Sequence, residues 1–316
     1  MKRRPPRCTR IPSTYGVVDT ALVNNDSDTV TGDVWDVLTN GSRIGLKGDE
    51  DLGNGLKAIF QYEFATNTSE GGGYAGGSTS LNNRLGFVGL TGGFGTVAIG
   101  RQWTPYYGSV DKTDIMDLNP SQGGIGGAID GNANAHYLGL TRTGNALAYV
   151  SPNFNGLTGK VALVIDDGRT AAADVSDGID AINVSLDYNN GPLSVGFSVL
   201  DFDSALETAP AGADRWGLAG KYNFGNFALM AQYEDRSDSS AGNDGSEAYG
   251  IGAQAYFGNN TISVVYGQRT PDVGADLDSM GISFRHDFSK RTRIYATYEQ
   301  ADRKSTRLNP VTWPSR

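Results

Sequence analysis

Cysteine is almost absent from this chain of 316 residues, which contains only Cys8. A single cysteine excludes a disulfide framework and a cysteine-based metal site. Long apolar runs are missing as well, because no stretch approaches the roughly 20 residues that a transmembrane helix needs. This excludes a helical membrane protein. It leaves a membrane-spanning β-barrel open, because only every second residue of a barrel strand faces lipid.

Histidine is scarce too, with His136 and His286 as the two examples. A barrel enzyme such as a phospholipase or protease needs a positioned base beside a nucleophile or an acid pair, and neither histidine has such a context. We therefore predict no catalytic residue, no metal ligand and no cofactor, and keep a barrel enzyme as the alternative. The acidic segment 166–180 departs from EF-hand spacing and is interpreted as a solvated loop rather than a Ca²⁺ site. The net charge of −9 argues against a nucleic-acid partner.

Glycine and aromatic residues are plentiful, and the sequence alternates. There are 44 glycines, about twice the usual share of roughly 7%, and aromatic residues reach 10%, which argues against disorder. Apolar and polar residues alternate along most of the chain. In the segment AINVSLDY, for example, one parity is apolar (Ile182, Val184, Leu186, Tyr188) and the other polar (Asn183, Ser185, Asp187). Because successive strand side chains point to opposite faces, each such segment predicts a strand with one apolar and one polar face.

About fifteen segments of about 8–11 residues follow this pattern, the length that a tilted strand needs to cross a bilayer. Short turns alternate with long connections, a rhythm typical of an antiparallel up-and-down transmembrane β-barrel. The long connections are predicted near 24–41, 66–82, 103–141, 166–179, 203–213, 236–246 and 269–277. Aromatic residues near the short turns predict an interfacial girdle: Tyr222, Phe224, Phe227, Tyr256, Phe257 and Phe288.

The alternative all-β architecture is a soluble β-sandwich, since antiparallel sheets also alternate. The regular short and long rhythm favours the barrel. Because bacterial single-chain barrels have even strand numbers, fifteen strands predict a sixteen-stranded type whose last strand is missing, which leaves a gap. We place the barrel at 14–302. The basic, proline-rich segment 1–13 and the tail 303–316 do not alternate, and each is interpreted as non-native or disordered sequence.

Five stretches, with the later hairpins, resemble the general diffusion porins of Gram-negative outer membranes, most closely those of β-proteobacteria. They are TYGVVDTAL (14–22), SRIGLKGDEDLGNGLKAIFQYE (42–63), NRLGFVGL (83–90), GTVAIGRQ (95–102) and AYVSPNFNGLTG (148–159). The resemblance implies a homotrimeric, sixteen-stranded channel in contact with outer-membrane lipid and lipopolysaccharide. It also implies passive diffusion of ions and small hydrophilic solutes.

The resemblance further implies that the third long connection, about 103–141, folds into the barrel and sets size and charge selectivity. Matching residue by residue, the basic wall of the constriction consists of Arg43, Arg84, Arg101 and Arg142. The acids on the loop are Asp114 and Asp117, with Asp111 less securely aligned. Opposed rows of charge inside a water-filled barrel set ion preference. An adhesin-like barrel, a further alternative, has no need of such an inward loop.

Alternation tests these assignments independently. Arg43 and Arg84 oppose apolar neighbours and are predicted to face the lumen, whereas Arg101 shares the parity of Val97 and Ile99. Arg101 therefore faces the pore only if the strand bulges at Gly100. Further basic residues on polar parities are Lys47, Lys57, Lys160, Lys221, Arg285 and Arg293. A basic lumen predicts a mild anion preference despite the net negative charge.

Overall fold

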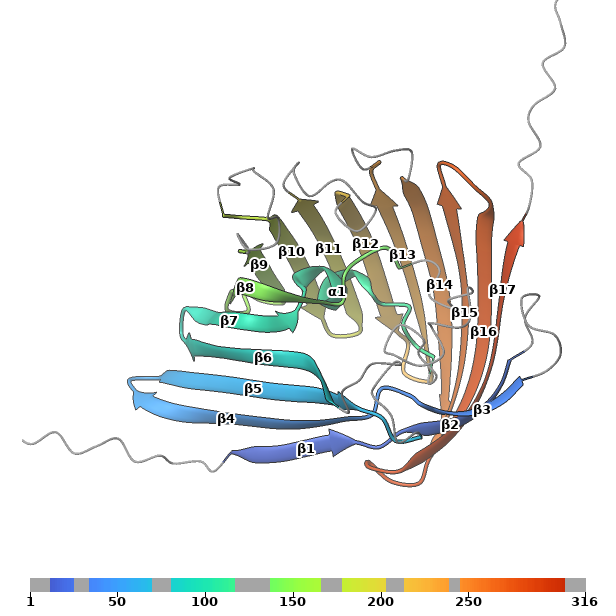
Figure 1. Ribbon diagram of the computed structural model, residues 1–316, viewed down its shortest axis with the longest axis horizontal. Coiled ribbons are helices and arrows are strands. Elements are labelled where there is room, and N and C mark those ends of the chain that lie inside the picture. The colour runs from blue at the N-terminus through green and yellow to red at the C-terminus, as the bar shows by residue number, and fades with distance from the viewer. Residues whose placement is uncertain are drawn as a thin grey trace, which may run out of the picture.

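A single antiparallel sheet of fifteen strands forms most of the part of the chain that the computed structural model describes (Figure 1). The structure describes residues 12–25, 34–69, 81–116, 137–165, 178–202, 213–238 and 245–304. The strands are β1 (Ser13–Val17), β4 (Arg43–Gly53), β5 (Leu56–Thr66), β6 (Leu81–Gly92), β7 (Gly95–Trp103), β8 (Arg142–Val150), β9 (Leu157–Val164), β10 (Ala181–Asn190), β11 (Leu193–Phe202), β12 (Arg215–Asn223), β13 (Phe227–Arg236), β14 (Ser246–Phe257), β15 (Asn260–Pro271), β16 (Asp276–Asp287) and β17 (Arg293–Lys304). From β4 to β17 each strand pairs with the next in sequence, and β1 pairs with β4, so the sheet is an up-and-down barrel wall.

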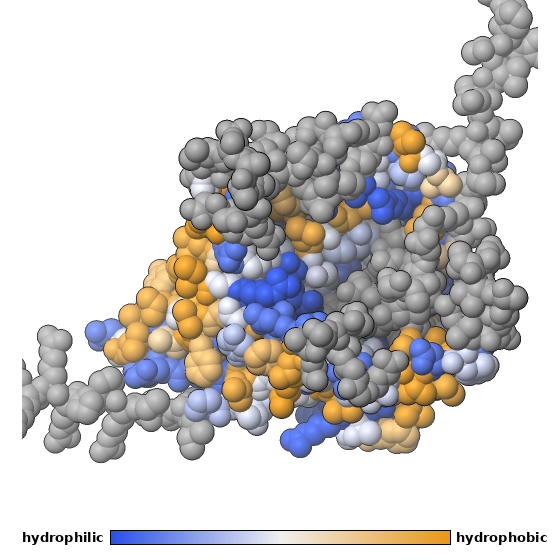
Figure 2. All heavy atoms as spheres, viewed as in Figure 1, coloured by the Kyte–Doolittle hydropathy of each residue, from blue (hydrophilic) through white to orange (hydrophobic). Residues whose placement is uncertain are grey.

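Burial along the strands is the reverse of that in a soluble sheet. On β10 the apolar residues Ile182, Val184 and Leu186 are 41%, 51% and 48% exposed, and the polar residues Asn183, Ser185 and Asp187 are 2%, 3% and 4% exposed. In Figure 2 apolar residues gather on the outer margin over β5–β7, while polar ones line the interior. Exposing this much apolar surface to water would cost about 25 cal/mol per Å², so the outer face is suited to lipid. A β-sandwich would bury the apolar faces, and that alternative is wrong.

Two connections are shorter than the sequence predicted. Within the expected loop 24–41, residues Val34–Thr39 form β3, which pairs with β2 (Thr20–Asn25) in a separate two-stranded sheet. The alternation in VWDVLT explains the additional strand. The connection expected at 269–277 is also mostly strand, because β15 reaches Pro271 and β16 begins at Asp276.

The connection after β7 contains a short helix, α1 (Pro105–Val110), where the sequence predicted irregular structure. The Thr104 hydroxyl caps it by accepting a hydrogen bond from the Tyr107 N–H at 3.0 Å, and Pro105 supplies a preset φ at its first turn. In Figure 1 the sheet curves around this helix. No helix in the described ranges is long and apolar enough to cross a membrane.

The sheet ends at β1 and β17, which are not paired with each other. A side-chain contact nevertheless joins these edges. The Tyr295 hydroxyl, on β17, donates a hydrogen bond to Asp19 Oδ1 at 2.6 Å and accepts one from Asn40 Nδ2 at 3.0 Å. Asp19 lies between β1 and β2, and Asn40 between β3 and β4. The predicted count of fifteen strands is confirmed.

The aromatic girdle near the short turns is confirmed with one exception. The exposed rings on the outer face are Tyr222, Phe224, Phe227, Phe257 and Phe288. Tyr256 was predicted among them, but its hydroxyl donates a hydrogen bond to Gln254 Oε1 at 3.0 Å on the inner face. Tyr256 shares the strand parity of buried Gln254, and this parity overrides the general preference of tyrosine for the interface.

Candidate functional site

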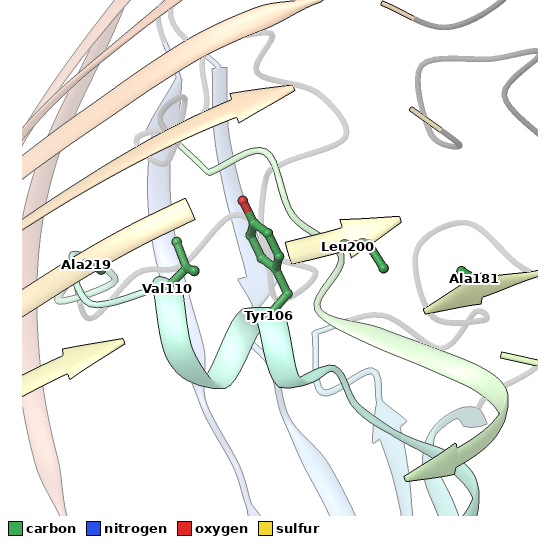
Figure 3. Packing of buried hydrophobic residues seen from close by; sticks show 5 residues of the cluster. All are labelled: Tyr106, Val110, Ala181, Leu200 and Ala219. Carbon is green, nitrogen blue, oxygen red and sulfur yellow. The ribbon is translucent and has the colours of Figure 1, made fainter. Parts of the chain in front are cut away.

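The helix α1 packs against the inside of the barrel wall through a small apolar cluster. Tyr106 and Val110 are fully buried and contact Ala181, Leu200 and Ala219 on β10, β11 and β12. Figure 3 shows both side chains pointing from α1 toward these strands. The described part of the third connection therefore folds into the barrel, as the sequence predicted.

Hydrogen bonds from wall side chains hold both limbs of this connection. Asn183 Oδ1 accepts from the Tyr106 N–H at 2.8 Å. Glu234 Oε2 accepts from the Tyr106 hydroxyl at 3.0 Å and from the Leu138 N–H at 2.9 Å. Further along, Gln232 Oε1 accepts from the Thr113 N–H at 3.1 Å. Since these groups are buried, each unmade bond would cost about 1–3 kcal/mol.

Glycines on the inner face form a row that lets the loop lie against the wall. A β-carbon built on Gly196 would lie 2.0 Å from Ser109 O, and one on Gly217 would lie 2.7 Å from Val110 Cγ1. The row continues across the barrel. A β-carbon on Gly252 would lie 2.9 Å from Ile115 Cδ1, and one on Gly281 would lie 2.8 Å from Met116 Cε. Residues 109–116 thus cross from β11 to β16 along positions where a larger side chain would require the loop or its side chains to shift.

The predicted arginine wall lies on the long-connection side and contains a carboxylate that the sequence analysis missed. Arg84 Nε contacts Glu63 Oε1 at 2.7 Å, and both side chains are 6% exposed. Arg43 Nε lies 3.8 Å from Glu63 Oε2, which also accepts from the Tyr15 hydroxyl at 2.8 Å. Glu63 has the polar parity of β5, which is the signal that could have identified it. The structure brings Arg43 and Arg84 together around this one acid.

Two aromatic rings connect the wall to the loop. The Arg142 guanidinium lies 3.9 Å from the centroid of the Trp103 ring, and that of Arg84 lies 5.9 Å from it. Trp103 stacks on Tyr107 with the ring centroids 4.9 Å apart. The Tyr107 hydroxyl donates a hydrogen bond to Asp114 Oδ2 at 3.2 Å. Trp103 and Tyr107 could not be identified from the sequence, because aromatic residues at this point of an irregular segment give no distinct signal.

The strand is irregular next to Arg101, at the bulge that an inward direction of this residue would require. The register shifts between Gly100 and Gln102, and Gly100 has a φ of 125°. Such a φ favours glycine, which explains the residue at this bulge. Arg101 pairs with Gly86, and its Nε donates to the backbone oxygen of Asn83 at 3.1 Å. Its charge also acts on Arg142, so it belongs electrostatically to the wall group.

The loop acids differ from one another. Asp114 accepts the hydrogen bond from the Tyr107 hydroxyl. Burial raises the pKa of Asp111 well above its usual range, and the negative charges of Asp114 and Glu234 raise it further. Asp111 is therefore held toward its neutral form against the wall. The predicted loop acid Asp117 lies outside the described residues.

The other basic residues lie on the inner face and are partly paired. Lys47 Nζ lies 5.3 Å from the Tyr15 ring centroid, and Lys57 lies 3.4 Å from Asp49. Arg285 contacts Asp287 at 3.2 Å. Lys160 and Lys221 lie near α1, where Lys160 contacts Asp187 at 2.6 Å and Lys221 contacts Gln254 at 3.4 Å.

No catalytic constellation or metal site is apparent in the part of the chain that the structure describes. His286 Nδ1 lies 2.8 Å from Asn260 Oδ1, and its ring lies edge-on to Phe288. Among the described residues no group of three His, Cys, Asp or Glu side chains is placed to hold a metal ion. His136 and most of the acidic segment 166–180 lie outside the described residues.

A lipid-facing barrel with a charged loop packed inside it defines the class of membrane-spanning diffusion channels. The chain belongs to the Gram-negative porin family, which matches residues 12–306. It is accordingly a channel protein of the outer membrane.

Known proteins agree with this assignment. The chain is 29% identical over 295 residues to outer membrane porin protein 32 of Delftia acidovorans, covering 89% of this chain and 81% of the relative. It is 30% identical over 277 residues to the major outer membrane protein P.IB of Neisseria meningitidis, covering 81% and 75%. Among solved structures, the anion-selective porin from Comamonas acidovorans superposes with a TM-score of 0.72 at 24% identity, covering 93% of this chain and 89% of that one.

Proposed function

We propose that this porin passes ions and small hydrophilic solutes through a constriction between the loop after β7 and the wall around Arg43, Arg84 and Arg142, with a mild preference for anions. One observation carries the proposal. A chain of side-chain contacts holds the Asp114 carboxylate of the loop in a fixed position relative to the arginine wall. It runs from Arg142 through Trp103 and Tyr107 to Asp114. Charges fixed across a narrow aqueous passage set its ion preference, and its width sets the size limit.

The sign of the preference follows from the inner face. On the loop, Asp111 is held toward neutrality, while the arginines of the wall and the lysines of the inner face supply positive charge along the passage. The relative that superposes on this chain is described as anion-selective, which supports the same sign. The barrel was predicted at 14–302, and its first and last strands extend slightly past these bounds, to Ser13 and to Lys304.

The proposed assembly is a homotrimer in contact with lipid and lipopolysaccharide. The exposed apolar belt supports the lipid contact. A solved porin of Vibrio cholerae that shares the fold is described as a trimer, which supports the assembly. The proposed activity is non-enzymatic, since the described residues offer a passage rather than a nucleophile with a base.

Deleting residues 108–124 tests the role of the loop. Conductance in planar bilayers is expected to rise, and the reversal potential in a KCl gradient is expected to move toward zero, because the deletion removes α1 with its contacts and widens the passage, and fixed charges discriminate less between ions in a wider passage. Deleting 203–212, between β11 and β12, serves as the control and is expected to change neither. A wild-type protein with clear cation selectivity would contradict the anion preference, and unchanged conductance after the first deletion would contradict the constriction. A wild-type protein that does not conduct would favour an adhesin-like barrel.

A further inference from the structure

A second basic group lies on the inner face of the barrel, apart from the arginine wall. It consists of Lys112 on the loop, Lys160 on β9 and Lys221 on β12, here termed the lysine cluster. Lys160 lies close to the short turn before β9, and Lys221 close to the short turn after β12. Arg43, Arg84 and Arg142 instead lie where their strands emerge from the long connections. The two basic groups therefore lie at different depths of the passage.

One carboxylate serves this cluster. Asp187 Oδ2 lies 2.6 Å from Lys160 Nζ and accepts from the Ser109 hydroxyl at 2.8 Å, while its Oδ1 lies 3.9 Å from Lys112 Nζ. Lys221 Nζ donates to the neutral amide of Gln254 at 3.4 Å. Within the described residues the cluster thus carries three ammonium groups, two of which contact the carboxylate of Asp187, and the charge of Asp111 also acts on Lys112.

The lysine cluster is partly removed from water but still accessible. The side chains of Lys112 and Lys160 are 16% and 21% exposed, whereas that of Asp187 is 6% exposed. Burial lowers the pKa of Lys112, and the charges of Lys160 and Lys221 lower it further, while Asp187 and Asp111 oppose the shift. Positive charge concentrated at low exposure is stabilised by an anion, because electrostatic interactions strengthen as water is excluded.

We propose that the lysine cluster is a binding site for small multivalent oxyanions, with inorganic phosphate as the simplest member, on the short-turn side of the constriction. Lysine supplies compact point charges with rotatable donors, a chemistry suited to phosphate oxygens. The site extends the proposed anion preference and rests on it. An anion leaving the arginine wall then meets a second binding site. Adjacent sites that bind an ion with moderate strength permit both its entry and its release.

Block of single-channel chloride current by phosphate tests the site in the full-length protein. Lys221→Gln and Lys112→Gln are each expected to raise the half-blocking phosphate concentration about threefold, the effect of losing one partly exposed ion pair, and the double variant more. Lys221→Arg keeps the charge and is expected to restore the block. Lys57→Gln is the matched control, because it removes the same charge from a lumen lysine paired with Asp49 on β4. It is expected to leave the block unchanged.

An equal shift in Lys57→Gln would overturn the site and leave only a general effect of lumen charge. Absence of phosphate block in the wild type would overturn it as well. Reversal potentials measured on the same membranes separate this inference from the proposed function. Anion selectivity with a block insensitive to Lys221 refutes the site alone, and cation selectivity with a Lys221-sensitive block refutes the proposed preference alone. Lys221→Gln decides the question if Lys112→Gln forms no channels, because the contact of Lys221 with the described residues is to the neutral amide of Gln254.

Discussion

The Tyr106 hydroxyl donates a hydrogen bond to Glu234 over 3.0 Å, and both residues are fully buried. The same carboxylate accepts from the backbone of Leu138 on the returning limb of the loop and from Gln232 Nε2 at 2.9 Å. One acid on β13 therefore joins both limbs of the loop to the wall. The position of the loop depends on the wall as much as on the loop sequence.

Glu234→Gln is expected to loosen the loop. An amide in place of the carboxylate presents an N–H group to donors that need acceptors, which costs about 1–3 kcal/mol for a buried group left unpaired. Single-channel recordings are expected to show higher mean conductance and more current noise. Glu247→Gln on β14 makes the same change at an exposed position and serves as the control. Identical recordings from both variants would show that Glu234 does not hold the loop.

Gly217→Val is expected to act in the opposite direction. A β-carbon at Gly217 would lie 2.7 Å from Val110 Cγ1 and 2.8 Å from the Tyr106 hydroxyl oxygen, so the loop must move off the wall toward the arginines. Conductance is expected to fall. Gly220→Val on the same strand meets nothing closer than 3.9 Å and is expected to leave conductance unchanged. Wild-type conductance in Gly217→Val would contradict the close packing of α1.

Alternation predicted the strands and the inward direction of Arg43 and Arg84, because a period of two decides which face a side chain takes. It also identified the need for a bulge at Gly100. The alternation of apolar and polar residues could not show that Glu63 contacts the arginines or that Glu234 holds the loop. A polar residue on an inner face is either solvated or buried, depending on what packs above it. For the same reason the pattern could not show that the Asp111 carboxylate is buried close to the charges of Asp114 and Glu234. Tyr256 was misplaced because residue type was given more weight than parity.

Arg84→Gln is expected to destabilise the barrel. The Arg84 and Glu63 side chains are both 6% exposed, and breaking a buried ion pair by removing one partner costs about 3–5 kcal/mol. The lower end of that range applies, because Arg43 and Tyr15 still contact Glu63. The temperature at which the detergent-solubilised protein loses its strand circular dichroism is expected to fall. The double variant Arg84→Gln with Glu63→Gln removes the unpaired charge and is expected to recover part of the loss. A double variant less stable than Arg84→Gln alone would contradict this account.

Asp111 and Asp114 are expected to respond differently to neutralisation and to pH. Asp114→Asn removes a charge and is expected to move the KCl reversal potential toward stronger anion selectivity at neutral pH. Asp111→Asn is expected to have little effect there, because burial and neighbouring acids raise the pKa of Asp111 and keep it toward its neutral form.

A carboxyl whose folded pKa is raised contributes stability that is present at low pH and is lost as pH rises through that folded pKa. The window lies above the ordinary aspartate pKa of about 3.9. Wild-type current noise is therefore expected to increase as pH rises above that value, and Asp111→Asn, neutral at every pH, is expected to remove that increase. A noise profile that rises equally in both proteins would show that another group controls the packing of the loop.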